Sequence, residues 1–342
     1  MTKKNPLLEV KAEAENVNLS ELDKLWPKGM GESARAWVIK RIPSGMAPSA
    51  TLNLKGNLDL EKPENFKLLK LGGTIHIKNA LVNYLDAYPV VTQVDGIATY
   101  DPANFNIQIS KGQSLNQVVQ SGEIKMSKLD TEKPRYYMDL DLKGDLGSAL
   151  QIANSGSIKF VDDYGIKPQQ SKGQAVTNLK LELPLGEDTQ SSQVDLDLKS
   201  TIKGVTLKHV VKTPDISLTN GDLSLKIRDR QLELKGKADL NGSPSDIYWA
   251  EDFRKSANVS KEVKVDATLR HDKLKELGVP LADYFEGQIP LKLVMQEKTN
   301  KSGYMNIDAS LNGVAVDLPH FKYKKSKQTS GKISVTSKLS KD

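Results

Sequence analysis

Two pairs of acidic residues, each pair two positions apart, are the residues of this chain whose spacing could support chemistry. Asp139 and Asp141 form one pair, and Asp195 and Asp197 form the other. Two carboxylates on one face can divide acid and base roles, but only when burial or a charged partner shifts their pKa values. Both pairs lie in alternating segments with lysines nearby, so we expect these carboxylates to face water and to take part in no reaction.

The histidines and the other acidic residues give no catalytic or metal-binding pattern. The four histidines, His76, His209, His271 and His320, are far apart, and His76 lies on the predicted wet face of a strand. Residues 162–165 lack the spaced oxygen ligands of an EF-hand loop and are predicted to form a turn. No HExxH, P-loop, GxGxxG or GxSxG motif is present. The sequence therefore predicts no enzyme, no cofactor and no metal.

Alternation of apolar and polar residues is the dominant pattern of the chain. Residues 194–199 and 223–228 place every apolar side chain at one parity and nearly every charge at the other. Successive side chains of a strand point to opposite faces, so these segments predict antiparallel strands with one dry and one wet face. The predicted fold class is mainly β, a long antiparallel sheet with a few short helices.

The composition supports a wide, one-sided sheet and argues against several classes of partner. Of the 342 residues, 38% are hydrophobic and 6% aromatic, which is low for a thick two-layer core. The 49 basic and 43 acidic residues are interleaved, so the net charge of +6 predicts a solvated surface and no nucleic-acid site. The basic cluster at 322–327 is predicted to be a solvated loop, with contact to anionic head groups as the alternative. Without cysteine, no disulfide or thiolate site can form.

The pattern divides the chain into two predicted segments that are continuous with each other. The first, residues 1–172, contains a helical pair at about 18–42, and the second, residues 173–342, contains helices near 245–254 and 272–285. The helical pair is predicted from apolar residues at helical spacing between strand-like segments, and a proline and a glycine follow it.

Glycine-containing pairs mark the predicted turns between strands. Asn220-Gly221 and Asn241-Gly242 lie between apolar runs and predict two-residue hairpin turns. Lys111-Gly112 and Ser121-Gly122 are predicted to be turns of a strand meander.

The ends of the sequence suggest a piece of a longer protein. Alternation is already present at residues 8–14 and still continues at 333–336. No stretch approaches the ~20 apolar residues of a membrane span, and no signal peptide is visible. We therefore expect a membrane anchor to lie outside this chain.

Four motifs, in order along nearly the whole chain, carry a resemblance to a known family. They are Leu25-Trp26-Pro27 with 34–38 and 42–45, residues 234–244 with Trp249 and Phe253, residues 277–281 with Tyr284 and Gly287, and residues 311–319 with 323–325. Together they resemble the AsmA-like domains of the YhdP and TamB group of Gram-negative bacteria, with the last three closest to alphaproteobacterial members. The chain departs from that family by lacking its N-terminal membrane helix and its remaining repeats.

The resemblance implies a bridge-like lipid transfer protein of the periplasm. Its fold would be an open, repeating β-groove made of a long twisted sheet with an apolar concave face. Its partners would be phospholipids, and regions outside this chain would contact the inner and outer membranes, with the anchor in the inner membrane. The family offers no catalytic residues to carry over.

The predicted lipid-binding residues are those of the dry strand face, and their choice depends on strand register. They are Leu140, Leu142, Leu181, Leu183, Val194, Leu196, Leu198, Leu223, Leu225, Ile227, Leu232, Leu234, Val263, Val265, Leu291, Leu293, Ile307 and Leu311.

Two other functions are weighed against a lipid conduit. A structural or assembly β-module of the cell envelope would act through protein partners and would have a closed, dry core. A hydrolase on a β scaffold has no supporting motif. A charge placed on the dry face would unfold the closed module, whereas in an open groove it would displace lipid and leave the fold intact.

Overall fold

Strands dominate the chain, as the alternation predicted. The computed structural model describes residues 6–25, 32–62, 66–84, 86–155, 160–185, 193–212, 215–276 and 282–340. The main sheet has 16 strands, and most connections join neighbours in the sequence. Neighbouring strands with a described register run antiparallel, for example at both ends of the sheet order. In the described residues the first and last strands of the order do not pair, so the sheet is not closed.

The main sheet follows the chain order. Its strands are β1 (Leu7–Asn18), β2 (Ser44–Asn57), β3 (Lys67–Val82), β4 (Val91–Tyr100), β5 (Phe105–Ser114), β6 (Gln117–Ser127), β7 (Arg135–Asp145), β8 (Lys172–Pro184), β9 (Asp195–Lys212), β10 (Asp215–Arg228), β11 (Gln231–Leu240), β12 (Ser243–Asp252), β13 (Val259–Arg270), β15 (Gln288–Lys298), β16 (Gly303–Ser310) and β19 (Lys332–Leu339). A second sheet has three short strands, β14 (Phe285–Glu286), β17 (Ala315–Leu318) and β18 (Tyr323–Lys325).

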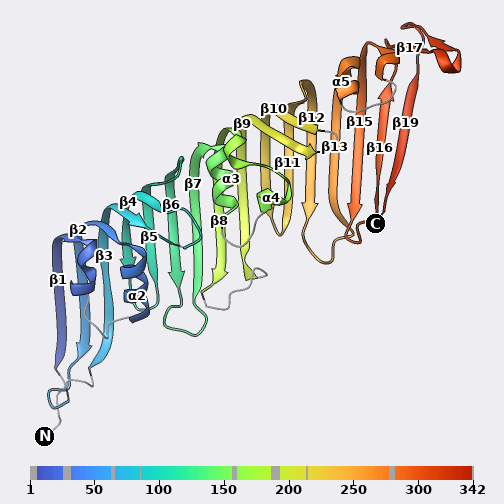
Figure 1. The fold of residues 1–342 in the computed structure, drawn as a ribbon. Helices are drawn as coiled ribbons and strands as arrows, with labels where there is room; N and C mark the ends of the chain where they lie inside the picture. The colour runs from blue at the N-terminus through green and yellow to red at the C-terminus, as the bar shows by residue number, and fades with distance from the viewer. Residues whose placement is uncertain are drawn as a thin grey trace. The chain divides into compact units, whose positions relative to one another are not determined.

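Two compact units divide the chain. Unit 1 comprises Met1–Lys143, Ser155–Ser157 and Asn178–Asp195, and unit 2 comprises Gly144–Asn154, Ile158–Thr177 and Leu196–Asp342. Within each unit the strands lie side by side in chain order (Figure 1).

Unit 1 contains the predicted N-terminal helical pair. Its helical elements are η1 (Leu19–Glu21), α1 (Leu22–Leu25) and α2 (Glu32–Arg41). The side chain of Asn18 accepts a hydrogen bond from the backbone N–H of Ser20 at 3.1 Å, which satisfies one of the first free amides of η1. Trp26 of the family motif lies outside the described residues.

Unit 2 carries the remaining helical elements. They are α3 (Leu146–Ala153), α4 (Phe160–Asp163), η3 (Pro168–Gln170), α5 (His271–Glu276), η5 (Ala282–Tyr284) and η6 (Pro319–Phe321). The α3 helix begins after Asp145, whose carboxylate accepts from the Ser148 N–H at 2.8 Å. The segment predicted as a turn at 162–165 begins inside α4, which ends at Asp163, and only residues 164–165 form a turn, where the Gly165 N–H bonds the Asp162 carbonyl at 2.8 Å.

The helix predicted near 245–254 is wrong. Residues 245–252 belong to β12, which pairs with β11 on one side and β13 on the other, and 253–254 follow its end. Apolar spacing over such a short segment fits a helix or a strand, and pairing on both sides decides for the strand. Of the helix predicted at 272–285, α5 and η5 are present at its two ends, and residues 277–281 lie outside the described residues.

Three predicted turns are wrong because their glycines lie inside strands. Lys111-Gly112 belongs to β5, Ser121-Gly122 to β6 and Asn220-Gly221 to β10. The β5–β6 hairpin instead turns at Leu115 and Asn116, because Ser114 pairs with Gln117. Small residues at strand-interior positions allow close packing from neighbouring strands, so glycine there does not require a turn.

Candidate functional site

The cross-strand register brings the predicted site residues of unit 2 onto one face. Directly opposed residues of an antiparallel pair point to the same side of the sheet. One row of such pairs runs through Leu225, Leu234, Trp249, Val263 and Met295. The adjacent row, two residues along each strand, consists of Leu223, Gly236, Ile247, Val265, Leu293 and Ile307. We call the side that carries these rows the apolar face of unit 2.

The other predicted residues of unit 2 belong to the same face. Leu198 is opposite Ile227, which is opposite Leu232, so these three side chains form a further row. Leu196 has the parity of Leu198 in β9, and Leu291 lies opposite Ala309. Leu311 follows the end of β16 and is buried in a cluster with Val314 and Val316.

Unit 1 has an apolar face of its own. One row runs through Ala50, Ile75, Ala98, Ile107 and Ile124. The predicted residues of this unit are in β7 and β8 or just before β9, and all are half-buried. They are Leu140, Leu142, Leu181, Leu183 and Val194.

Leu140 can be placed on the unit 1 face by contact. Gly122 is opposite Ile109 in the register of β5 and β6, and the space above Gly122 is filled by the side chain of Leu140. An added Cβ at Gly122 would clash with that side chain. Strands β5 and β7 therefore present Ile109 and Leu140 on the same side of the sheet as Gly122 of β6.

Helices cover part of the apolar face of unit 2. Leu146 of α3 is buried in a cluster with Ala175, Ile202, Val205, Leu218, Leu223 and Ala238. Leu274 of α5 and Ala282 of η5 are buried with Ala267, Leu269, Ile289, Leu311, Val314 and Val316. We call these two clusters the covered part of the face.

The rest of the face is only half-buried. Leu198, Ile227, Val263, Leu293 and Ile307 are all of intermediate exposure, and none belongs to a buried cluster of the described residues. We call these five residues the open part of the face. Leu198 is opposite Ile227 on β9 and β10, and Val263, Leu293 and Ile307 lie on β13, β15 and β16, where Leu293 is opposite Ile307. Between these two groups, β11 and β12 carry the half-buried Leu234 and Trp249 on the same face, and no second sheet of described residues packs on the five residues.

Sequence reasoning missed four residues of this face. Ile247 and Trp249 were predicted to lie in a helix. Met295 and Met305, which are opposite each other on β15 and β16, were not among the predicted residues. The alternation of Ser245, Ile247, Trp249 and Glu251 was the available signal for the first two.

A polar cluster interrupts the apolar face of unit 2. Glu251 has the parity of Trp249 and is 6% exposed. Its carboxylate accepts hydrogen bonds from the Tyr164 hydroxyl, from Trp249 Nε1 at 3.2 Å and from Lys261 Nζ at 2.9 Å. The ring of Tyr164 meets Trp249 edge to face, with centroids 4.8 Å apart. The short segment after α4 is therefore tied to β12 through a fully partnered carboxylate.

Burial is the main cause of the raised pKa of Tyr164, and the hydrogen bond to Glu251 adds to it. Ionising this hydroxyl would remove a donor and place a second negative charge beside the Glu251 carboxylate. The hydroxyl is thus held in its neutral, donating form. The Lys261 ammonium lies 5.3 Å from the centre of the same ring.

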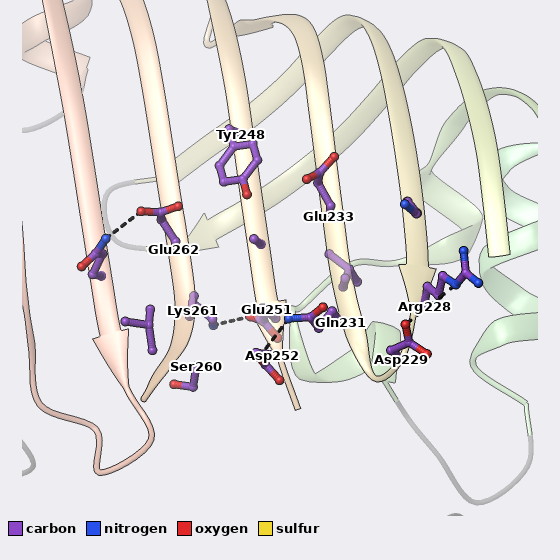
Figure 2. A pocket seen from close by; sticks show the side chains of 15 residues that line it. Arg228, Asp229, Gln231, Glu233, Tyr248, Glu251, Asp252, Ser260, Lys261 and Glu262 are labelled. Atoms are coloured by element: carbon purple, nitrogen blue, oxygen red, sulfur yellow. Dashed lines mark hydrogen bonds and ion pairs between the residues drawn. The ribbon is translucent and has the colours of Figure 1, made fainter. Parts of the chain in front are cut away.

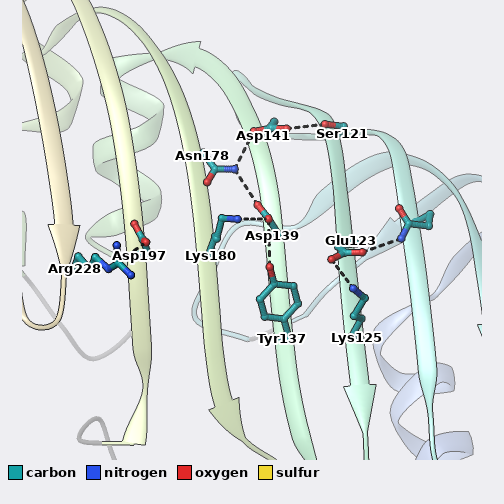
Figure 3. A network of polar contacts seen from close by, with 11 residues as sticks. Ser121, Glu123, Lys125, Tyr137, Asp139, Asp141, Asn178, Lys180, Asp197 and Arg228 are labelled. Carbon is teal, nitrogen blue, oxygen red and sulfur yellow. Dashed lines mark hydrogen bonds and ion pairs between the residues drawn. The ribbon is translucent and has the colours of Figure 1, made fainter.

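The opposite face is polar in both units, as the wet face was expected to be. In unit 1, Asp139 accepts from Lys180 at 2.8 Å and from Asn178 at 2.9 Å, and Asp141 accepts from Ser121 at 2.8 Å (Figure 3). Desolvation raises the pKa of Asp139, but the bonds from Lys180 and Asn178 outweigh it and the net pKa is lowered. This carboxylate is therefore an ionised ion-pair partner.

A hollow of about 510 Å³ lies mainly on the polar face of unit 2 (Figure 2). Glu262 at its wall accepts from Gln296 at 2.7 Å and pairs with Lys264 at 2.9 Å. Tyr248 lies beneath the Lys264 ammonium, which is 5.0 Å from the ring centre. These charged groups bond to one another and to neighbouring side chains, which is typical of a solvated sheet surface.

The second acidic pair and the histidines also occupy surface positions. Asp195 is exposed, and Asp197 is 3.7 Å from the Arg228 guanidinium. His76 is exposed on the polar face, as predicted. In the described part of the chain, no group of three or more His, Cys, Asp or Glu side chains could hold a metal ion. No described helix has the length and apolar character needed to cross a membrane.

Comparison with known proteins gives one family. A search of curated proteins gives no match, and a search of solved structures gives none. A family model described as YhdP protein matches residues 1–342. This match extends over every residue of the chain and agrees with the resemblance to AsmA-like domains, so the chain belongs to the YhdP protein family.

Proposed function

We propose that this chain binds phospholipid acyl chains on its apolar face and acts as part of a lipid-transfer conduit. The observation that carries the proposal is the open part of the face in unit 2. Apolar side chains there lie on β9 and β10 and again on β13, β15 and β16, with the half-buried Leu234 and Trp249 on the strands between, and none of the five is buried by the described residues. Contiguous apolar surface that stays accessible is typical of an interaction site.

Acyl chains suit this surface for a physical reason. The open part offers Leu, Ile and Val side chains in rows and no polar group among its five members. Apolar contact has no preferred direction and its free energy grows with the area buried, about 25 cal/mol per Å². A hydrocarbon chain could therefore shift along the rows without breaking specific bonds, as a conduit requires.

Family membership supports the cellular setting of the proposal. The resemblance to the YhdP and TamB group implies a periplasmic protein that carries phospholipid between the inner and outer membranes. Regions outside this chain would connect it to the inner and outer membranes, and other envelope proteins could bind to those regions. The proposal assigns this chain no catalytic step.

Native mass spectrometry with lipid extraction, on protein purified without detergent, tests the proposal. Leu293→Asp places a charge on the open part, and Val294→Asp places the same charge on the next residue of β15, opposite Lys264 on the polar face. We expect phospholipid to co-purify with the wild type and with Val294→Asp, and to be lost from Leu293→Asp. Both variants should keep the circular dichroism spectrum of the wild type.

Two results would contradict a lipid groove. One is a wild-type protein free of lipid that melts cooperatively and does not respond to added phospholipid. The other is unfolding of Leu293→Asp, because a closed core and not an open face would then lie at that position. Either result would favour an envelope assembly module that acts through protein partners.

A further inference from the structure

A small basic tip with two exposed aromatic rings stands apart from the apolar face. It is formed by His320, Phe321, Lys322 and Tyr323, which join η6 to β18. Phe321 is 73% exposed, the highest value of any exposed large hydrophobic residue in the described chain, and Tyr323 is 50% exposed. Phe is among the residue types most often buried, so a ring that is 73% exposed, with a half-exposed tyrosine two residues away, is unusual.

The tip is a built structure. It follows Val314 and Val316, which are 0% and 4% exposed. The Lys325 ammonium, which is buried, donates to the carbonyls of Leu311 and Val314, each at 2.7 Å. The Lys322 N–H bonds the Pro319 carbonyl at 3.0 Å, which closes the turn. The exposure of the two rings is therefore a property of the folded chain.

The charge of the tip is positive. Residues 315–327 contain four lysines and one acidic residue, Asp317. Lys324 pairs with Asp317 at 3.0 Å, and Lys327 pairs with Glu286 of β14 at 2.6 Å. Lys322, between the two rings in sequence, has no acidic side chain within ion-pair distance in the described chain.

We propose that this tip docks on the surface of a lipid bilayer that contains anionic phospholipids. Aromatic side chains favour the boundary between head groups and acyl chains, and a lysine beside them, here Lys322, is attracted to anionic head groups. A protein partner fits less well, because a stable protein interface buries about 800 Å² on each side, far more than two rings offer. The inference concerns membrane docking and does not depend on lipid binding by the apolar face.

Co-sedimentation with vesicles tests the docking. The chain is mixed with phosphatidylcholine vesicles with and without phosphatidylglycerol. We expect binding to the anionic vesicles that weakens as salt is raised, since the Debye length shortens. The double variant Phe321→Ser/Tyr323→Ser should bind at least ~10-fold more weakly, the effect expected when two interfacial rings are lost. Phe253→Ser, at a residue 47% exposed and followed by Arg254, is the matched control and should bind like the wild type.

A second measurement reports on insertion directly. Phe321→Trp adds a fluorophore at the tip, and brominated phospholipid should quench it beyond the quenching of wild-type tryptophan. Leu293→Asp should lose co-purified lipid and keep vesicle binding, which separates failure of the groove from failure of the tip. Equal binding by the double variant and the wild type, or no extra quenching of Phe321→Trp, would overturn the proposal and point to a protein partner.

Discussion

The covered and open parts of the apolar face in unit 2 have the same strand pattern and different surroundings. Val205 and Ala267 are 0% and 4% exposed, whereas Val263 and Leu293 remain half-exposed. The strands themselves do not make this difference, since both sets alternate with polar residues. The difference in exposure comes from the segments between the strands, because α3, α5 and η5 pack on the covered part and do not reach the open part. The dry face of a sheet is therefore not one environment, and its uncovered remainder is where ligand binding is to be sought.

The largest expected effect comes from placing a charge in the covered part. Val205→Asp would bury a carboxylate with no partner, so we expect unit 2 to lose its cooperative fold, a cost above ~4 kcal/mol. Leu293→Asp keeps its carboxylate half in water and should cost about 1–2 kcal/mol. Urea unfolding followed by near-ultraviolet circular dichroism compares the two. Equal destabilisation by both substitutions would remove the distinction between the parts.

A milder pair of substitutions tests the role of α3 as a cover. Leu146→Ala removes a side chain that is 5% exposed and packed in a buried cluster, so we expect a loss of about 2–4 kcal/mol. Leu198→Ala in the open part removes a half-exposed side chain and should cost about 1 kcal/mol. The midpoints of urea unfolding measure both values. A larger loss for Leu198→Ala would mean that the open part is packed and the α3 contact dispensable.

Two identical dipeptides show why part of the fold could not be predicted from the sequence. Asn241-Gly242 forms the predicted hairpin turn, because Leu240 pairs with Ser243 and both turn residues have positive φ, 47° and 81°. Asn220-Gly221 lies inside β10, where the register shifts between Thr219 and Asp222. Asn220 has φ 51° and its side chain donates to Asp239 at 2.8 Å.

The asparagine adopts a left-handed backbone in both places, and of the two glycines only Gly242 does. A turn and a β-bulge are distinguished only by whether the chain continues to pair beyond the dipeptide. That depends on β9 and β11, which lie elsewhere in the sequence. Alternation predicts strand parity well, which is why the predicted residues of unit 2 with a described register share one face. It does not predict where α3 and α5 lie, so it could not separate the covered from the open part.

The Glu251 cluster also lay beyond sequence reasoning. Tyr164 and Glu251 are separated by 87 positions and come together only because the segment after α4 reaches β12. A glutamate within an alternating strand is normally assigned to water. Glu251 is two residues from Trp249 and therefore points to the apolar face, but this follows only if residues 245–252 form a strand.

Two half-buried tyrosines should respond differently to loss of the hydroxyl. In unit 2, Tyr164→Phe removes a donor to the Glu251 carboxylate, so we expect a loss of about 1.5–3 kcal/mol. In unit 1, the Tyr136 hydroxyl donates to the Met138 sulfur at 3.6 Å, a weak acceptor, so Tyr136→Phe should cost under ~0.5 kcal/mol. Thermal unfolding near neutral pH measures both losses. Similar losses would show that the Glu251 bond contributes no more than a weak sulfur contact.

The same hydroxyls predict an alkaline limit to stability. Burial raises the pKa of Tyr136 to about 12, and burial with the Glu251 bond raises the pKa of Tyr164. Because the folded pKa lies above the unfolded value near 10, the stabilisation is complete below about pH 10 and is lost as the pH rises past it. Tyr164→Phe should lose less stability than the wild type between neutral pH and about pH 11. A parallel fall in both proteins would contradict the assignment.

The smallest expected effect lies on the polar face, where ion pairs remain hydrated. The Arg254 guanidinium, bonded to Asp252 at 2.5 Å, lowers the pKa of that carboxyl to about 2. The folded pKa lies below the unfolded value near 3.9, so the stabilisation is present above about pH 4 and lost as the pH falls toward about 2. Asp252→Asn should therefore unfold slightly more easily than the wild type near pH 6 and match it near pH 2. If the difference between the two proteins persisted at pH 2, Asp252 would stabilise the chain through packing and not through charge, and the polar face would resemble the covered part more than its exposure suggests.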